Sequence, residues 1–408
     1  MTALFLYDDA RARSFEPFAS TRPISEMVAG TALIRTRWAS ALRPRETRFV
    51  AGPHHQDFDE PGALAAEGTI PSGSIIALSR CAPALTAESA QAARRAATCS
   101  MWRCGTELAA LRIKESMDVA AFADGTLALD ELSPGTGSIG TVEGWWLNEV
   151  WDFIRLLPEQ LASDLAAPSV PPGTRPDGSV IIGSHAVAVA TDAVIEPHVV
   201  FDASAGPISV GAGSHVHAFT RLVGPCYLGR RVTVMGGDVT GCSIGDVSKV
   251  RGELSNSIVL GHANKGHDGF VGHSYLGRWV NLGAGTITSN LKNTYGTVAL
   301  WTPAGVRDTG MQFLGTLFGD HVKTGIGLQL TTGTVLGAGA NVYGAMPPKA
   351  VAPFSWGDGS PYAVYRADKF VETAGRVMSR RQVDLTEAAR RHLLAVHSGR
   401  WAVEGDTA

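Results

Sequence analysis

The sequence predicts an α/β domain, then a parallel β-helix built from hexapeptide repeats, then a short helical segment. Three observations lead to this fold class. Apolar runs alternate with helical stretches up to residue 165, a segment rich in proline, glycine and serine follows at 166–180, and aliphatic residues then recur at every sixth position across 181–350. Helical periodicity returns in residues 351–408.

The composition limits the class of protein. Of 408 residues, 45% are hydrophobic and 18% are charged, as in an ordinary globular chain. The net charge is −3 and no basic cluster is longer than Ser379–Arg381, which argues against nucleic acid as the main partner. The chain shows neither a signal peptide nor an apolar run long enough to span a membrane, so we expect a cytoplasmic protein with no membrane partner.

The cysteines do not show the spacing of a disulfide framework or of a metal site. They are odd in number and contain no Cys-x-x-Cys pair, which is typical of reduced thiols in the cytosol. Two of them could in principle ligate a metal, but no second pair completes a site, so no metal site is expected. The five are Cys81, Cys99, Cys104, Cys226 and Cys242.

The first domain is expected to occupy residues 1–165. The runs "ALFLY" (3–7), "TRFVAG" (47–52) and "GSIIALS" (73–79) have the apolar character of buried strands. The stretch "TAESAQAARRAATC" (86–99) has the composition of a helix. Alternation of the two kinds predicts an α/β domain.

The six-residue repeat predicts the β-helix at 181–350. A period of six fits neither a helix nor simple alternation, but it suits a short strand followed by a tight corner, often at a glycine. Three such strands make one triangular coil, and stacked coils bury their aliphatic residues in a column. A glycine-rich β-sandwich would instead alternate with period two. The four runs are Ile182, Ala188, Val194, Val200; Val210, Val216, Leu222, Leu228, Val234; Phe270, Leu276, Leu282, Thr288; and Phe318, Thr324, Leu330, Leu336, Val342.

The segment after residue 350 is expected to form two amphipathic helices. Phe370, Ala374 and Met378 share one helical face, and Leu385 and Leu393 fit the second helix. We interpret the segment 351–408 as a cap that covers the open end of the β-helix or docks on a neighbouring subunit.

One stretch interrupts the repeat with polar residues. "NKGHDGF" (264–270) breaks the register, and an interruption on a regular scaffold is a typical place for function. A lone histidine is more often structural than catalytic, and that interpretation holds for His273. His267 has Lys265 and Asp268 beside it, and a neutral imidazole can accept a proton at cytosolic pH.

The stretch "NKGHDGFVGHSYLGRWVNLGAGTITSNLKN" (264–293) resembles the acetyltransferase domain of the bifunctional N-acetylglucosamine-1-phosphate uridyltransferase/glucosamine-1-phosphate acetyltransferase family. The likeness covers roughly residues 249–342. The wider chain resembles a shorter branch of sugar nucleotidyltransferases called GlmU-like. The resemblance implies a left-handed β-helix, acetyl-CoA as co-substrate, a sugar phosphate or nucleotide sugar as acceptor, and a homotrimer with sites between subunits.

The resemblance also implies residue roles. His267 takes the place of the general base that deprotonates an amino sugar. Asn281 and Asn290 take the places of sugar contacts, and Ala284 and Gly344 lie where the coenzyme A arm runs.

Two positions depart from the family pattern. Phe270 replaces a sugar-binding tyrosine, and Ser255 replaces a lysine that holds the sugar phosphate. Lys249, Arg251 or Lys292 could supply the missing charge.

The chemistry agrees with direct acyl transfer. Attack of an amine on a thioester needs a base and hydrogen-bond donors for the oxyanion, and backbone N–H groups at glycine corners can serve. No cysteine lies in the segment, so direct attack is favoured over a covalent acyl-enzyme. The insertion at 291–313 leaves the six-residue register and could wrap a neighbour or close the site.

The first domain resembles the nucleotidyltransferase-like domain of the shorter branch, in "LFLYDDARARSFEPFASTRPISEMVAG" (4–30) and "GWWLNEVWDFIRLLPEQLASDL" (144–165). The glycine-rich phosphate loop of the full family is missing. Candidates for phosphate contact are Arg11, Arg13 and Arg22, and Asp8 or Asp9 could bind Mg²⁺ if the domain is an active nucleotidyltransferase.

Equally, the two aspartates could cap the first helix and the arginines could be surface charge. Two further functions therefore stay open: a sugar-1-phosphate nucleotidyltransferase whose β-helix only assembles the oligomer, and a non-catalytic binding scaffold.

Overall fold

The computed structural model describes residues 2–86, 98–166, 177–359 and 361–399. They form two compact units, one of Met1–Asp152 with Thr386–Gly399 and one that includes Phe153–Leu385. Most of the linker expected at 166–180 and of the helix expected at 86–99 lies outside the described residues. None of the described helices is both long and apolar enough to cross a membrane.

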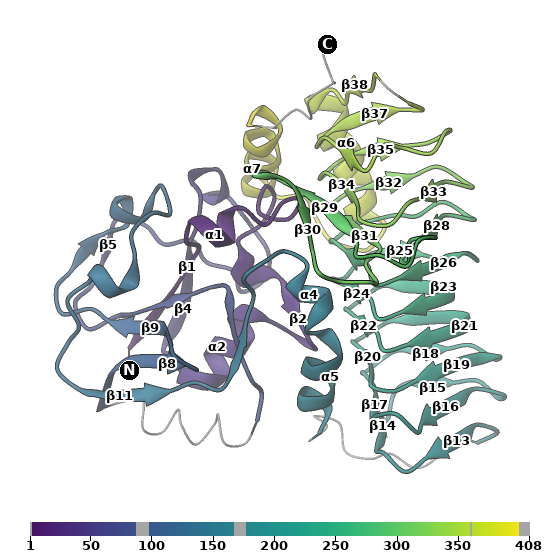
Figure 1. Ribbon diagram of the computed structural model, residues 1–408, viewed down its shortest axis with the longest axis horizontal. Helices are drawn as coiled ribbons and strands as arrows, with labels where there is room; N and C mark the ends of the chain where they lie inside the picture. Colours follow the sequence, from purple (N-terminus) through teal and green to yellow (C-terminus); the bar gives the residue numbers. More distant parts are fainter. Residues whose placement is uncertain (1, 87–97, 167–176, 360, 400–408) are drawn as a thin grey trace. The chain divides into compact units, whose positions relative to one another are not determined.

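The first unit is built on a six-stranded sheet with the order β11-β8-β9-β6-β1-β4 (Figure 1). Strand β1 runs parallel to both of its neighbours, β4 and β6, and β9 runs antiparallel to β6 and to β8. The apolar runs of the sequence explain the three parallel strands, because each supplies buried residues to this sheet. The strands are β1 (Ala3–Tyr7), β4 (Glu46–Val50), β6 (Ile75–Leu78), β8 (Cys99–Cys104), β9 (Glu107–Arg112) and β11 (Ser138–Thr141).

Shorter elements complete this unit. Helices α1 (Ala10–Arg13) and α2 (Ile34–Leu42) follow the first strand, and three small strand pairs surround the sheet. The pairs are β2 (Val28–Ala29) with β3 (Ala32–Leu33), β5 (Thr69–Ile70) with β10 (Met117–Asp118), and β7 (Cys81–Pro83) with β12 (Gly144–Trp146).

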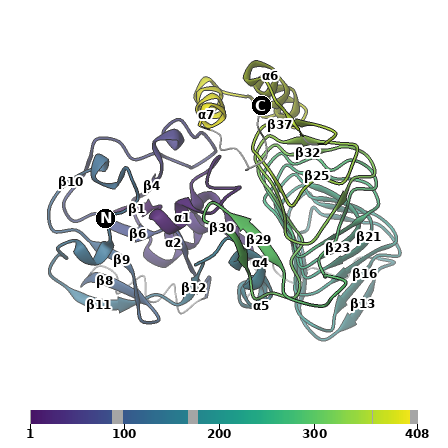
Figure 2. The ribbon, with the colours of Figure 1, turned by 45° about the horizontal axis from the view of Figure 1, so that its top comes forward.

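The second unit is a parallel β-helix of about 10 turns that matches the left-handed form, so the predicted fold class is confirmed. Its strands stack in register as three faces, which Figures 1 and 2 show from two directions. The first face holds β14 (Val187–Val189), β17 (Ile208–Val210), β20 (Cys226–Leu228), β22 (Ser243–Ile244), β24 (Ile258–Val259), β27 (Tyr275–Leu276), β31 (Thr316–Phe318), β34 (Thr334–Leu336) and β36 (Ala350–Val351).

The other two faces share the long strands β21 (Thr233–Thr240) and β23 (Lys249–Ser255), each of which turns a corner. The second face holds β15 (Val194–Ile195), β18 (His215–Val216), the starts of β21 and β23, β25 (Asn264–Lys265), β32 (Lys323–Thr324), β35 (Asn341–Val342) and β37 (Ser355–Gly357). The third holds β13 (Val180–Gly183), β16 (Val200–Ala203), β19 (Thr220–Val223), the ends of β21 and β23, β26 (Phe270–Gly272), β28 (Ile287–Thr288) and β33 (Gln329–Leu330).

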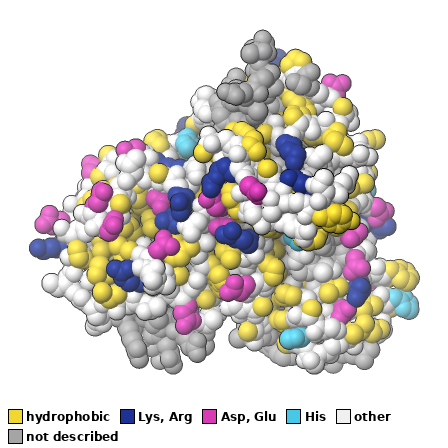
Figure 3. Space-filling view, in the orientation of Figure 1, with side chains coloured by type: hydrophobic (Ala, Val, Ile, Leu, Met, Phe, Trp, Pro, Cys, Tyr) yellow, Lys and Arg dark blue, Asp and Glu magenta, His cyan; other side chains and the backbone are white. Residues whose placement is uncertain are grey.

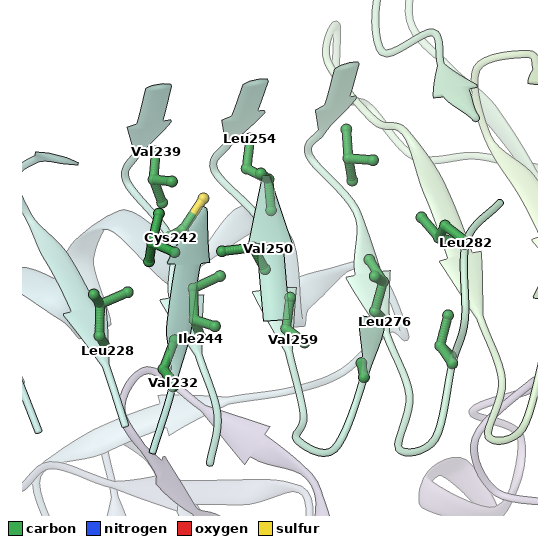
Figure 4. Packing of buried hydrophobic residues seen from close by; sticks show 14 of the residues in the cluster. Leu228, Val232, Val239, Cys242, Ile244, Val250, Leu254, Val259, Leu276 and Leu282 are labelled. Carbon is green, nitrogen blue, oxygen red and sulfur yellow. The ribbon is translucent and has the colours of Figure 1, made fainter. Parts of the chain in front are cut away.

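The core of the β-helix is the aliphatic column that the repeat predicts. Every residue of the second run, from Val210 to Val234, is fully buried. Figure 4 shows residues of successive coils, among them Leu228, Ile244, Val259 and Leu276, pointing into the same narrow interior. Such burial is the main source of stability in a solenoid, because each coil covers its neighbour.

The first predicted run is displaced by one residue. Val194 is 54% exposed and Ile182 is 45% exposed, so they do not face the core. The inward positions are instead Val189, Ile195 and Phe201, which belong to or pack against the column. The six-residue period is kept. Because apolar residues stand at two adjacent positions of each strand, the sequence does not show which of the two points inward. In the third run, Val271 is buried in place of Phe270, because apolar residues occupy both adjacent positions there as well.

The helices are divided between the units differently from the expected boundaries. Helices α4 (Asp152–Arg155) and α5 (Leu157–Leu165) cluster with the β-helix, where Phe153 packs edge-on against Tyr275. Helix α6 (Ala367–Ser379) packs on the last coils through Phe370, which contacts Phe354. Helix α7 (Glu387–Ser398), which the sequence predicts as part of the same cap, belongs instead to the first unit.

Helix α7 is held in the first unit by specific contacts. Arg391 pairs with Asp57 at 2.7 Å, and Thr386 caps the helix while donating its hydroxyl proton to Asp59. The buried imidazole of His392 lies 2.9 Å from the carbonyl oxygen of His54 and 2.8 Å from that of Thr21. The chain therefore returns to the first unit after completing the β-helix.

The insertion at 291–313 forms an antiparallel hairpin of β29 (Ala299–Thr302) and β30 (Gly305–Asp308). Its base is closed by pairing of Leu291 with Phe313, and Val298 and Leu300 are fully buried. Val306 at the tip is 72% exposed. The base of the insertion thus packs on its own β-helix, and only its tip projects.

Candidate functional site

The polar interruption forms a corner of the β-helix, which we call the His267 corner. Residues Gly266–Gly269 turn between β25 on the second face and β26 on the third. Gly269 has φ +135°, and a Cβ atom there would lie 2.4 Å from the carbonyl oxygen of Thr286 on the next coil. Only glycine fits such a close approach, so the turn is fixed against its neighbour and presents His267 and Asp268 to solvent.

The His267 imidazole is exposed and, within the described ranges, has no hydrogen-bond or ion-pair partner. Its neighbour Asp268 accepts a hydrogen bond from Arg251 on the preceding coil, with an Nε–Oδ1 distance of 3.0 Å. Arg251 also donates to the backbone oxygen of Met235 at 2.7 Å. The arginine is therefore held at the corner, and the imidazole is left available to an incoming molecule.

A buried lysine braces this corner from inside the β-helix. Lys265 is 3% exposed and occupies an inward position of the column. Its Nζ donates to the backbone oxygen of Arg251 at 2.8 Å and to that of His267. Burial lowers the pKa of Lys265 to about 8. The lysine thus ties the two coils that meet at the candidate base.

A polar row runs along the outside of the second face beside this corner. Lys249 pairs with Asn264, Asn264 with Asn281, and Asn281 with Lys323 in the strand register. The Asn264 amide donates to Asn281 Oδ1 at 2.9 Å. The sequence pointed to Lys249 and Asn281, and the structure brings them together. Asn264 and Lys323 were missed, although their places in successive coils would have put them in the same row.

This row opens into a pocket of about 350 Å³ covered by the end of helix α6. The row residues line it together with the following Arg380 and Arg381. Among the described residues, these two arginines and the lysines Lys249 and Lys323 have no acidic partner in the structure. A pocket with uncompensated positive charge and two amides is suited to a phosphate group.

Lys323 is fixed at the floor of this pocket. Its Nζ donates to the backbone oxygens of Trp279 and His321, each at 3.0 Å. Burial lowers the pKa of Lys323 to about 8. Burial, together with the neighbouring Arg380, also lowers the pKa of Arg381. A bound anion would offset these costs of burying positive charge.

The two residues assigned to the coenzyme A arm follow the same corner upward. Ala284 holds the position of His267 on the next coil, where its carbonyl oxygen accepts from Gly327 N at 2.7 Å. Gly344 holds that position two coils further on, with φ +80°. Ile326 lies between them and is 81% exposed. These residues form one line along the edge of the β-helix, long enough for an extended ligand.

Asn290 and Lys292 lie elsewhere. Asn290 sits at the corner between the third and first faces, and its Nδ2 donates to His273 Nδ1 at 2.9 Å. The His273 ring stacks on Phe313 at 5.3 Å, and burial lowers the pKa of His273 to about 4. Lys292 follows Asn290 at this second corner. Within one chain, the structure does not bring Asn290 or Lys292 to His267.

In the first unit, a second pocket lies at the carboxyl ends of two parallel strands. It has a volume of about 680 Å³ and is lined by Asp9 and Arg11 after β1 and by Arg80 after β6. Arg80 pairs with Asp9 at 2.7 Å and donates to Asn148, to which Arg11 also donates. Ligands bind α/β sheets at this edge.

The other candidates of the first unit serve the fold. Arg22 is buried and pairs with Glu60 at 2.9 Å. Arg13 donates to the backbone oxygens of Asp8, Ala123 and Phe122. The surface-charge interpretation fails for both arginines, because each is tied to groups of its own unit. These contacts also argue against a direct role of either arginine in nucleotide binding.

The aspartates do not fit a Mg²⁺ site in this conformation. Asp8 is 1% exposed, with one oxygen bonded to Ser79 and the other to the backbone N–H of Ile24, and burial raises its pKa to about 7. Asp9 caps α1 with one oxygen and pairs with Arg80 through the other. Asp8 is shielded from solvent and Asp9 is paired with Arg80, so a metal would have to displace existing contacts, and the capping interpretation describes Asp9.

Several known proteins resemble parts of this chain. Residues 4–169 match a family model described as sugar nucleotidyl transferase. The chain is 32% identical over 91 residues to a bifunctional sugar-1-phosphate nucleotidylyltransferase/acetyltransferase of Sulfurisphaera tokodaii, a match that covers 22% of this chain and 23% of that protein.

Two bifunctional GlmU proteins give similar matches. That of Rippkaea orientalis is 32% identical over 124 residues, which are 26% of this chain and 26% of that protein. That of Desulfitobacterium hafniense is 31% identical over 172 residues, which are 40% and 33% of the two chains. The chain thus spans about a quarter to a third of the length of these relatives, and the resemblance to GlmU-like proteins is confirmed to that extent.

A solved structure, the hexapeptide transferase family protein of Anaplasma phagocytophilum, aligns over 54% of this chain and 96% of that chain. The sequence identity is 13% and the TM-score is 0.25. No functional conclusion follows from a likeness at this score.

Proposed function

We propose that the β-helix is an acetyl-CoA-dependent N-acetyltransferase that acts on an amino-sugar phosphate or a nucleotide-linked amino sugar. The observation that carries the proposal is the juxtaposition of three features. The cationic pocket, the Asn264–Asn281 pair and the His267 corner lie on neighbouring positions of the same coils. Positive charge for a phosphate, amides for sugar hydroxyls and a base for an amine are the groups that this acceptor needs.

The residues would divide the reaction as follows. The pocket would hold the acceptor by its phosphate while His267 takes a proton from its amine. The nitrogen attacks the thioester carbon, the carbonyl oxygen becomes an oxyanion, and the thiolate leaves and takes up a proton as free coenzyme A. Backbone N–H groups at the corner can stabilise the oxyanion. The line from Ala284 to Gly344 would carry the extended coenzyme A arm.

We further propose a homotrimer in which the two corners come from different subunits. Asn290 and Lys292 are separated from His267 by the full width of the third face. A neighbouring copy could supply them, as the sequence resemblance implies. A cytoplasmic location, expected from the sequence, stays a prediction.

The first test measures thiol release from acetyl-CoA against a panel of amino-sugar phosphates and nucleotide-linked amino sugars. We expect one acceptor to react, and His267→Ala to lower the rate by about 10²-fold or more, as expected for loss of a general base. His185→Ala, an exposed histidine on the first coil, is the matched control and should keep full activity. Activity that survives His267→Ala would exclude this residue as the base.

The second test examines the pocket with the double variant Arg380→Gln/Arg381→Gln. We expect KM for the acceptor to rise about tenfold or more while KM for acetyl-CoA stays unchanged, because charge-assisted contacts to phosphate are lost. The control is Arg376→Gln, an exposed α6 residue paired with Glu372 and not lining the pocket. A rise in KM for acetyl-CoA alone would assign the pocket to coenzyme A phosphates instead.

A second candidate function is a sugar-1-phosphate nucleotidyltransferase in the first unit. The match of residues 4–169 to a sugar nucleotidyl transferase family and the pocket at the strand ends favour it. Release of pyrophosphate from a nucleoside triphosphate and a sugar 1-phosphate would support it. The occupied carboxylates of Asp8 and Asp9 argue for a domain that binds a nucleotide sugar without transferring it.

A further inference from the structure

The first coils of the β-helix carry a cluster of side chains that acyl transfer does not use. Glu196 lies on one coil, and His215 and His217 lie on the next. Glu196 Oε1 is 2.8 Å from His215 Nε2 and 3.2 Å from His217 Nδ1. The three ligand atoms all lie within 4.8 Å of one another. The cluster stands three coils before His267, in the same edge of the β-helix.

These separations are those of ligands around one metal ion. Two atoms bound to tetrahedral zinc lie about 3.3 Å apart, given Zn–N bonds of about 2.0–2.1 Å. The two carboxylate–imidazole distances of the cluster, 2.8 and 3.2 Å, are slightly shorter than that value, so a small outward movement of the side chains would admit the ion. The imidazole rings are stacked with their centroids 4.2 Å apart and nearly parallel, and one nitrogen atom of each ring faces Oε1 of Glu196.

The carboxylate is already oriented. Glu196 Oε2 accepts the backbone N–H of Ala218 at 2.8 Å, which leaves Oε1 for the imidazole side. The Ala218 N–H and the His215 ring lower the pKa of Glu196. A ligand held by a second hydrogen bond is typical of metal sites, because the outer contact fixes its orientation.

The cluster is open to solvent. The three side chains are between 33% and 39% exposed, and Figure 3 shows histidine side chains at the surface over the first coils, beside apolar ones. A metal with three protein ligands at an exposed edge keeps a coordination position for water, as in sites that act on a ligand rather than closed structural sites.

We propose that Glu196, His215 and His217 form a binding site for a divalent transition metal of the Zn²⁺ type. Two imidazoles and one carboxylate select such ions over Mg²⁺ and Ca²⁺, which prefer oxygen ligands. The metal would cross-link two successive coils and keep one open position. This site is independent of the proposed acetyl transfer, and neither proposal rests on the other.

The test uses the full chain after removal of metals with a chelator. Titration with Zn²⁺ by calorimetry, and with Co²⁺ by visible absorption, should show one ion bound per chain. Mg²⁺ should give no binding. His215→Ala, His217→Ala and Glu196→Gln should each weaken Zn²⁺ binding by about 10–100-fold or more. Far-UV circular dichroism of each metal-free variant checks that the β-helix is intact.

The matched control is His198→Ala. His198 is a histidine of the same edge that stacks on Phe219 and is not part of the cluster, so its loss should leave Zn²⁺ affinity unchanged. Absence of one-to-one binding in the unmodified chain would overturn the proposal, and so would binding that survives in the triple variant of the cluster. Equal affinity for Mg²⁺ would overturn the assigned class of metal.

Discussion

At the scale of single residues, the His267 corner is supported from inside the β-helix by Lys265, whose Nζ donates to two backbone oxygens. His267 and Asn281 were found because they stand in a motif that breaks a regular repeat. Lys265 was noticed only as a neighbour of His267, yet it points inward and holds two carbonyl oxygens. An inward lysine contradicts the aliphatic rule of the repeat, so the pattern alone could not place it.

Lys265 gives the stability of the protein a pH dependence. Its pKa is about 8 in the folded chain and near the ordinary 10.5 when unfolded. The unfolded state therefore binds more protons between these values, and the free energy of unfolding should rise as pH increases from about 8 toward 10.5. Lys265→Met should remove part of this rise. Denaturant unfolding at pH 7.5 and 9.5 measures it.

Lys249→Met is the control for that experiment, because Lys249 is exposed on the adjacent coil. Lys323, whose pKa is also about 8, should retain its own share of the rise in both variants. A slope identical in wild type and Lys265→Met would show that the lysine is not buried in solution.

At the scale of elements, the strands were predictable and their partners were not. Period six located the coils, although β-branched residues on adjacent positions shifted the phase of the first run by one. The cationic pocket could not be predicted from the sequence. Arg380 and Arg381 are far in sequence from Lys249, and they line the same pocket only because helix α6 packs there. Amphipathic patterning predicted α6 and α7 but could not say which core each would join.

The docking of helix α7 depends on His392. Both imidazole nitrogens lie within 2.9 Å of carbonyl oxygens, and the side chain is buried, whereas the ion pair of Arg391 with Asp57 is exposed. His392→Gln should leave the β-helix intact but raise amide hydrogen exchange in α7 by about tenfold or more, since each lost hydrogen bond of a buried group costs about 1–3 kcal/mol. Hydrogen exchange with mass spectrometry reads each segment separately.

Arg390→Gln, an exposed position of the same helix, should change nothing in that measurement. Equal exchange in α7 of wild type and His392→Gln would mean that the other contacts of the helix, among them Arg391 with Asp57 and Thr386 with Asp59, hold it without His392.

At the scale of the whole molecule, the separation of the two corners makes a prediction about assembly. If the proposed site takes His267 from one subunit and Asn290 from the next, a mixed oligomer of His267→Ala and Asn290→Ala chains contains some intact sites. Co-expression should therefore restore activity to about a quarter of wild type, while each variant alone is inactive. If the mixed oligomer is as inactive as each variant alone, His267 and Asn290 belong to the site of the same subunit.

The control for this mixing experiment is His267→Ala combined with a chain that carries both substitutions. No arrangement of these two chains supplies an intact histidine, so their mixture should remain inactive. Light scattering on each preparation establishes whether the chains form the expected trimer.

The return of helix α7 to the first unit has a consequence for how the protein is made. A ribosome releases the chain from its N-terminus, so the first unit emerges without the segment Thr386–Gly399 that completes it. At about 5–20 residues per second, residues 153–385 take on the order of 10–50 s to synthesise. During that interval the carbonyl groups that will receive His392 have no donor from the helix. The first unit therefore stays incomplete on the ribosome until the whole β-helix, which lies between its two segments in the sequence, has been translated.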